Sequence, residues 1–249
     1  MTSSRVLFLS AAVAGLSVAA VVAQQAPAGR GRAGLNAPPP IVWPSPPLPD
    51  GPLSVETGLV RPVHITIVKG FTQPFSMAFL PDGGILVTER PGRLRLVRDG
   101  KLDPTPVAGV PRAQAQGLQG LMDIALHPRF AENHLVYLTY HKPAPGVSAA
   151  PTGRGGAAPP GTITLARARW DGGKLVDVHD IFSALPSGNA SRIAFGRDGM
   201  IYMSIGYGDP PAGNPNPAAA PPQDPMSLAG KVLRLRDDGT VPRDNPFVG

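Results

Sequence analysis

A short pattern of two apolar runs separated by a turn occurs three times in this chain of 249 residues. Residues 76–83 read Ser-Met-Ala-Phe-Leu-Pro-Asp-Gly and lead into a second apolar run at 85–88, and residues 192–204 repeat this order. A looser copy with a longer turn spans 123–139. Two short apolar runs on either side of a turn predict a β-hairpin. Because the hairpin recurs, we expect a chain built from similar β-sheet units.

A third strand-like segment follows each hairpin, at 93–97, 164–169 and 231–235. The segments lead into dipeptides that favour tight turns, namely Asp99-Gly100, Asp171-Gly172 and Asp238-Gly239. An Arg-x-Arg pattern also recurs in this part of each unit, and residues two apart on a strand share a face, so we expect a solvated basic face there. Three sheets of three or four strands indicate β-propeller blades lengthened by insertions, whereas a β-sandwich would not require the repeated Asp-Gly.

The composition agrees with an all-β fold and narrows the function classes. The chain contains 30 glycines and 32 prolines, which disfavour long helices and favour turn-rich structure. It contains no cysteine, which excludes disulfides, thiolate metal sites and cysteine nucleophiles. The net charge of +6 is dispersed along the chain without a Lys/Arg-rich run. We therefore expect no nucleic-acid partner, because dispersed basic residues are typical of a solvated surface.

The N-terminal residues have the organisation of an export signal. Residues 1–5 carry a positive charge, 6–23 are apolar, and Val21-Val22-Ala23 precedes Gln24 as a small-residue cleavage site. An uncleaved membrane anchor is the alternative reading. With cleavage, we expect residues 1–23 to be a signal peptide, no stable membrane span afterwards, and a periplasmic or secreted protein.

Two further boundaries follow from the composition. Residues 24–62 are rich in Pro, Ala and Gly without apolar periodicity, which predicts an extended linker. Residues 63–249 are then expected to be a partial β-propeller domain. Low-complexity inserts at 143–160 and 210–222 are typical of long surface loops.

Four stretches of this domain resemble the glucose/sorbosone dehydrogenase family: residues 74–98, 120–133, 191–206 and 223–247. The first holds Phe-Leu-Pro-Asp-Gly and Thr-Glu-Arg-Pro-Gly, and the last runs from Gln-Asp-Pro to Asn-Pro-Phe. The resemblance implies a six-bladed β-propeller, here incomplete at about three to four blades. It also implies PQQ and calcium as cofactors, a sugar or aldehyde substrate and an electron acceptor.

The resemblance implies a histidine that acts as general base, four residues before an arginine. That arginine matches Arg192, which places the histidine position at Gly188. Glycine cannot accept a proton, and the neutral amide of the adjacent Asn189 is no substitute. The catalytic base is therefore unassigned, and Asn189 and Arg192 are the candidate residues. The chain's five histidines are expected to be structural or solvent-facing.

Two residues are candidates for cofactor contacts. Family members commonly have Gln or Glu at the position that matches Leu118, and Gln119 is its neighbour. Asp209 follows Gly-Tyr-Gly, where the family has Gly-Asp at the mouth of the propeller. Both residues could instead cap turns or begin a loop. No metal ligand is assigned in this chain, because the resemblance implies that most cofactor and calcium contacts lie beyond Gly249.

Two functions remain open from the sequence. The first is PQQ-dependent oxidation of a sugar by the full-length parent, with this fragment inactive alone. The alternative is a non-catalytic propeller that binds carbohydrate or protein after loss of the histidine.

Overall fold

The computed structural model describes residues 47–58, 61–115, 119–146, 161–184, 190–206 and 221–247. The chain divides into two units, Met1–Pro47 and Leu48–Gly249, and every element below lies in the second. The signal peptide and most of the linker expected from the sequence lie outside the described residues. Within the described ranges, no helix has the length and apolar character needed to span a membrane.

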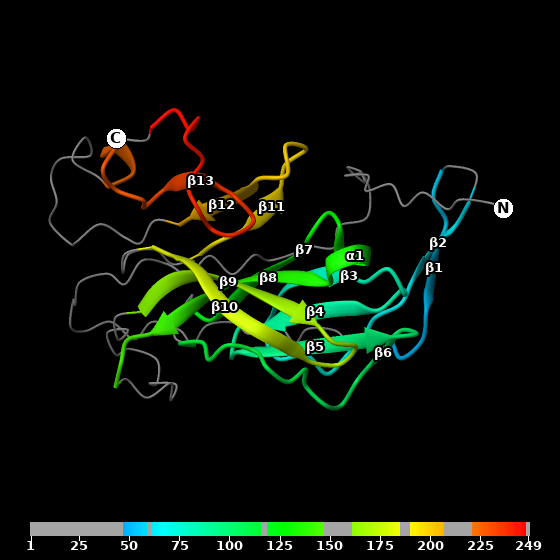
Figure 1. The fold of residues 1–249 in the computed structure, drawn as a ribbon. Coiled ribbons are helices and arrows are strands. Elements are labelled where there is room, and N and C mark those ends of the chain that lie inside the picture. The colour runs from blue at the N-terminus through cyan, green and yellow to red at the C-terminus, as the bar shows by residue number, and fades with distance from the viewer. Residues whose placement is uncertain are drawn as a thin grey trace, which may run out of the picture. The chain divides into compact units, whose positions relative to one another are not determined.

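Three antiparallel sheets contain most of the described strands (Figure 1). The first sheet contains β3 (Pro74–Phe79), β4 (Ile85–Glu89), β5 (Arg93–Arg98) and β6 (Lys101–Leu102). The middle sheet contains β7 (Leu121–Leu126), β8 (Leu135–Pro143), β9 (Gly161–Trp170) and β10 (Leu175–Ser183). The third sheet contains β11 (Ile193–Phe195), β12 (Ile201–Ile205) and β13 (Lys231–Leu235). Strands adjacent in sequence are adjacent in each sheet, which is the meander order of propeller blades.

The remaining elements are short. A helical turn, α1 (Phe130–Asn133), lies between β7 and β8, and the 3-10 turn η2 (Pro221–Gln223) precedes β13. β1 (Leu53–Val55) pairs with β2 (Val63–Ile65) in a two-stranded ribbon. β1 thus lies in the segment that the sequence assigned to the linker, and β2 begins at the predicted start of the domain.

The strand registers confirm the repeat. Each hairpin alanine pairs with one residue of the second strand of its sheet, in the pairs Ala78 with Leu86, Ala125 with Tyr137, and Ala194 with Tyr202. The three alanines therefore occupy equivalent positions. The fold is the all-β propeller type, and the described residues form three of its blades.

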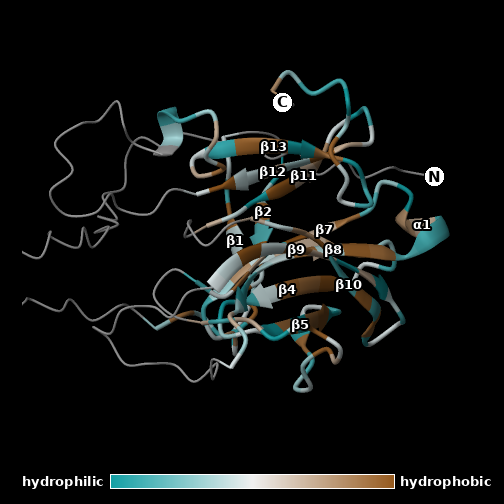
Figure 2. Ribbon diagram, turned by 60° about the vertical axis from the view of Figure 1, so that its left-hand side comes forward, coloured by the Kyte–Doolittle hydropathy of each residue, from teal (hydrophilic) through white to brown (hydrophobic). Residues whose placement is uncertain are grey.

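The middle sheet is buried on both faces because it lies between the other two sheets (Figures 1 and 2). On β8, Val136 and Leu138 belong to the core shared with the first sheet, whereas Tyr137, between them, belongs to the core shared with the third. Successive residues of a strand point to opposite faces. The apolar residues that Figure 2 colours brown along these strands therefore fill two cores, one on each side of the middle sheet.

The prediction of a solvated basic face is wrong for Arg95. Its side chain is buried, donates to the carbonyl oxygen of Asp103 and lies 3.6 Å from the carboxylate of Glu89. Glu89 is also fully buried and accepts a hydrogen bond from Arg93 at 2.6 Å. Arg93 and Arg95, which form the Arg-x-Arg pattern of the first sheet, neutralise the buried carboxylate of Glu89, because β4 and β5 bring these three side chains together.

Candidate functional site

The first strands of the three sheets, β3, β7 and β11, meet near their amino-terminal ends. The backbone N–H of Leu121 donates to the carbonyl oxygen of Arg90, and the N–H of Arg90 donates to that of Gln73. These bonds join the start of β7 to the start of β3 through the end of β4. We call this region the amino-terminal edge of the inner strands.

Asp123 on β7 connects all three sheets at this edge. Its buried carboxylate accepts the backbone N–H of Ile193 at 2.7 Å and the guanidinium Nη1 of Arg192 at 3.3 Å, both from the third sheet. The hydroxyl of Ser76, from the first sheet, donates to the same carboxylate. Ion pairing and several hydrogen bonds are what a buried carboxylate requires to stay ionised. Asp123 was not predicted as a site residue, although an acidic residue within the apolar run 121–126 was the available signal.

Arg192 reaches from the third sheet to the first. Its guanidinium carbon lies 4.3 Å from the centre of the Phe75 ring, a cation–π arrangement, and its Nη2 lies 3.5 Å from the Phe75 carbonyl oxygen. More than half of the side chain, 59%, is still exposed. The structure thus holds a planar cation in a fixed position with one side open to solvent.

Among the residues that the structure describes, several buried polar atoms at or near this edge have no hydrogen-bond partner: Arg90 Nε, Gln119 Oε1, Ser191 Oγ, and both amide atoms of Gln114. The side chain of Gln114 is fully buried, and its backbone N–H donates to the carbonyl oxygen of His141. Buried polar atoms are normally paired. These residues belong to the end of β4 and to the segments that precede β7 and β11, and a polar ligand or water would complete their hydrogen bonding.

The structure describes two of the sequence-predicted site residues. Arg192 and Gln119 are both at the amino-terminal edge, Arg192 at the start of β11 and Gln119 two residues before β7. Gly188, Asn189 and Asp209 lie outside the described residues. The described ranges contain no group of three or more His, Asp or Glu residues that could hold a metal ion.

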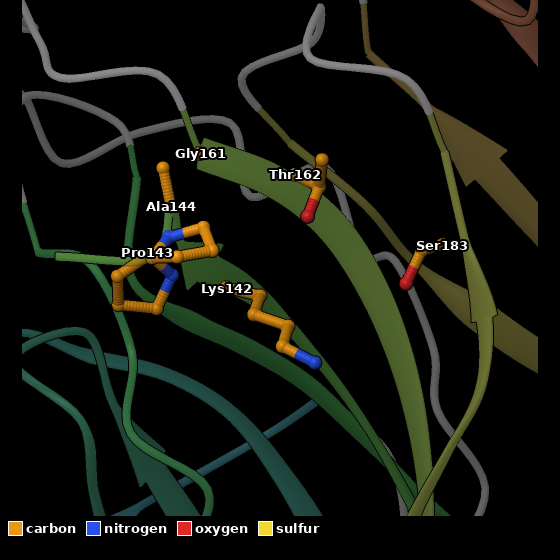
Figure 3. Close-up of a pocket in the computed structure, with 7 residues that line it drawn as sticks. Lys142, Pro143, Ala144, Gly161, Thr162 and Ser183 are labelled. Atoms are coloured by element: carbon orange, nitrogen blue, oxygen red, sulfur yellow. The ribbon is translucent and has the colours of Figure 1, made fainter. Parts of the chain in front are cut away.

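A separate hollow of about 320 Å³ lies where β8 ends, β9 begins and β10 ends (Figure 3). Its lining includes Lys142, Thr162 and Ser183. The Lys142 ammonium is 2.6 Å from one carboxylate oxygen of Asp180. The other carboxylate oxygen accepts a hydrogen bond from the Tyr140 hydroxyl at 2.8 Å. Because the lysine charge is neutralised, the hollow offers no strong anchor for a charged ligand.

His127 has a structural role. Its side chain is buried, its Nδ1 accepts the backbone N–H of Arg129 at 3.0 Å, and its ring packs against Tyr137 and Phe195. Since Nδ1 is an acceptor, the ring proton of the neutral form is on Nε2, 3.7 Å from a carboxylate oxygen of Asp237. Burial lowers the pKa of His127 from its ordinary value of 6.5, and the Asp237 carboxylate opposes this shift.

We expect His127 to make the chain less stable as the pH falls below about 6.5. The histidine of the unfolded chain then binds a proton more readily than the buried one, so protonation favours unfolding. Urea unfolding between pH 7 and pH 5 would measure this, and His127→Gln should flatten the pH dependence. Tyr137→Phe is the matched control, because it changes the same cluster and keeps the histidine, so its stability should fall evenly across the range. An unchanged slope in His127→Gln would contradict the assignment.

Comparison with known proteins gives a consistent result. The family described as glucose/sorbosone dehydrogenase matches residues 71–249. The aldose sugar dehydrogenase YliI of Escherichia coli is 34% identical over 181 residues, which cover 70% of this chain and 44% of that protein. Quinoprotein glucose dehydrogenase B of Acinetobacter calcoaceticus is 30% identical over 203 residues, covering 72% and 40% of the two chains.

A solved structure supports the same relationship. The PQQ-bound aldose sugar dehydrogenase of Streptomyces coelicolor has a TM-score of 0.57 and 31% identity, covering 74% of this chain and 51% of that one. The chain thus spans about half the length of the relatives it matches. The family match covers all three sheets and the edge where Asp123 and Arg192 meet. The chain belongs to the glucose/sorbosone dehydrogenase family.

Proposed function

We propose that the whole protein is a sugar dehydrogenase that uses PQQ to oxidise a sugar or aldehyde and passes the electrons to an external acceptor. The observation that carries the proposal is the amino-terminal edge of the inner strands. There, Arg192 presents an anchored and partly exposed guanidinium, and Gln119, Ser191 and Arg90 have buried polar atoms without partners.

The described residues fit an anionic, planar cofactor in part. PQQ carries carboxylates, for which a guanidinium is the best-matched side chain because it donates hydrogen bonds in a fixed plane. Arg192 would supply this contact, and the free amide oxygen of Gln119 could accept a hydrogen bond from the ligand. When bound, the quinone supplies the redox chemistry, and the protein supplies position and charge. Calcium has no ligand set among the described residues, and we assign it no role in them.

Gly188 is the main departure from a catalytic site. A general base is needed to take the proton of the substrate hydroxyl, and glycine has no side chain for this step. Asn189 could hold a hydroxyl by hydrogen bonding but could not remove its proton. This substitution supports the second candidate function, a propeller that binds carbohydrate or protein without oxidising it. Asp209 remains a proposed cofactor contact.

Export is part of the same proposal. We propose that residues 1–23 are removed as a signal peptide, that 24–62 form a linker, and that the enzyme acts in the periplasm or outside the cell. The apolar run and small-residue cleavage site before Gln24 support this assignment.

We expect the 249-residue chain, supplied with PQQ and calcium, to show no dye-linked oxidation of aldoses above background. The base position is a glycine, and the chain spans about half the length of its relatives. In the full-length parent, Gly188→His should raise the rate by about 10²–10⁴, the usual contribution of a positioned base. An active 249-residue chain would contradict the prediction.

The role of the amino-terminal edge is tested by PQQ binding to the full-length parent. Arg192→Gln should weaken PQQ binding by about tenfold or more, the scale of one lost charged hydrogen bond. The control is Arg197→Gln, which removes the same charge from an exposed turn of the third sheet. Sugar binding without PQQ binding or oxidation would instead establish the non-catalytic propeller.

A further inference from the structure

The strand β3 has a β-bulge at the amino-terminal edge of the inner strands. Pro74 pairs with Glu89, and the next pair along the strand is Ser76 with Thr88. Phe75 is therefore an extra residue that has no partner of its own on β4. The backbone N–H of Ser76 donates to the hydroxyl oxygen of Thr88, which is fully buried, at 3.0 Å. The threonine side chain thus supplies an acceptor at the point where the bulge interrupts the ladder.

The neighbouring strand β7 has a bulge at the same edge. Between its pairs at Leu121 and Ile124, β7 advances by three residues while β8 advances by two. Asp123 lies within this bulge, and its backbone N–H donates to the hydroxyl oxygen of Thr139, also fully buried, at 3.0 Å. Bulges re-aim the side chains of their strand and are frequent next to active sites. Two of them at one edge therefore indicate that the strands hold a group in a set position there.

The group that both bulges hold is the guanidinium of Arg192. The ring of Phe75 lies 4.3 Å from its central carbon, and the Phe75 carbonyl oxygen accepts from Nη2 at 3.5 Å. The Asp123 carboxylate accepts from Nη1 at 3.3 Å. A guanidinium has five N–H donors in one plane, so these two contacts leave donors for a ligand. The Phe75 side chain is itself half-buried against the core of the middle and third sheets, which holds the ring in place.

We infer that Phe75 is a positioning residue, which orients the Arg192 guanidinium for its contact with the cofactor. The inference rests on the proposed function and adds to it a residue of the first sheet that acts through an arginine of the third. Phe75 is uncharged, so its replacement changes the order of the guanidinium without changing the net charge of the site. Asp123 has two opposing effects, because its carboxylate orients the guanidinium and also repels an anionic ligand.

The advantage of this arrangement lies in the conformational entropy of the arginine side chain. A long, exposed arginine samples many rotamers, and ordering such a side chain when a ligand binds weakens the affinity. Stacking on the Phe75 ring orders the guanidinium before the ligand arrives. We therefore expect Phe75→Leu to weaken PQQ binding by the full-length parent by about 3- to 10-fold, the scale of immobilising one flexible side chain. Phe75→Tyr, which keeps the ring, should bind PQQ as the wild type does.

Titration with PQQ, followed by quenching of protein fluorescence, would measure these affinities. Phe79→Leu is the matched control, because it makes the same substitution on the same strand. Phe79 is 60% exposed and has a regular partner, Ile85, so its replacement should leave PQQ binding unchanged. Circular dichroism would verify the fold of each variant, and Phe75→Met is a second ring-free variant if Phe75→Leu does not fold.

A double-mutant cycle separates positioning from a general structural role of the ring. In an Arg192→Gln background, Phe75→Leu should leave the PQQ dissociation constant unchanged, because the ring then has no guanidinium to orient. A ring that only supports the packing of β3 would lower the affinity equally in both backgrounds.

The order of the Arg192 side chain is measured without PQQ. In the full-length parent labelled with 15N-arginine, the Nε signal that Arg192→Gln removes should have a heteronuclear NOE close to that of the backbone amides. Such a value indicates restricted motion on the picosecond-to-nanosecond timescale. Phe75→Leu should lower this NOE, and Phe75→Tyr should keep it.

The unfavourable results are distinguishable from one another. A mobile Arg192 Nε in the wild type, or one that Phe75→Leu leaves ordered, would overturn the inference. A loss of PQQ affinity that is equal with and without Arg192 would do the same. A parent that binds no PQQ, or whose affinity Arg192→Gln does not change, would overturn the proposed cofactor contact and the cofactor role of Phe75 with it, even if the NOE shows that Phe75 orders Arg192.

Discussion

Gly239→Ala is expected to lower the free energy of unfolding by about 3–5 kcal/mol, because the change combines backbone strain with a steric clash. Gly239 has a φ of +86°, a conformation that disfavours residues with a Cβ. A Cβ at this position would also lie 2.6 Å from the carbonyl carbon of Ile181, on β10 of the middle sheet. The clash lies between a turn that follows the third sheet and a strand of the middle sheet.

Gly83→Ala provides a control with the same backbone conformation. Gly83 also follows an aspartate in a turn and also has a φ of +86°, but nothing lies within 4 Å of a Cβ placed there. Its replacement should cost only the strain, about 1–2 kcal/mol. Urea unfolding of the two variants against the wild-type chain would separate the two contributions. Equal losses would mean that the turn at Gly239 relaxes away from Ile181 without cost.

These two glycines show what the sequence could and could not predict about the fold. Asp-Gly dipeptides after strand-like segments correctly predicted tight turns, and Gly100, Gly172 and Gly239 all have positive φ values. Turns and hairpins follow from local patterns, so the three sheets were predictable. The contact between Gly239 and Ile181 joins residues that are distant in the sequence, and no local pattern distinguishes Gly239 from Gly83.

In the candidate site, too, local patterns predicted some features, whereas contacts between distant residues could not be predicted. The family-like motif identified Arg192, but no local pattern predicted its partners Phe75 and Asp123, which belong to the other two sheets. Asp123 was counted within an apolar strand, since alternation predicts a face and not a hydrogen-bonding partner. Arg95 was expected in solvent for the same reason. For Arg192 and Asp123 the missing information was a contact between sheets, and for Arg95 it was the buried carboxylate of Glu89 on the neighbouring strand of the same sheet.

Asp123→Ala is expected to lower the free energy of unfolding by about 2–4 kcal/mol, mainly the cost of leaving buried hydrogen-bond donors without their acceptor. The substitution leaves the backbone N–H of Ile193 and the hydroxyl of Ser76 without their acceptor and releases the Arg192 guanidinium. A buried donor without an acceptor loses its solvation without compensation, and this cost exceeds the value of the bond itself. Asp123→Asn should cost less, because an amide keeps one acceptor oxygen, although its NH2 group cannot accept a second donor.

A double-mutant cycle would show whether Asp123 acts as a connection between sheets. Ser76→Ala alone should cost about 1 kcal/mol, the value of one hydrogen bond. In the presence of Asp123→Ala the same substitution should cost almost nothing, since the serine then has no acceptor to lose. In a second cycle, the losses of unfolding free energy caused by Asp123→Ala and Arg192→Gln should likewise be non-additive. If either pair proves additive, the corresponding sheet is held by its apolar core alone, and the carboxylate contributes only to its own strand.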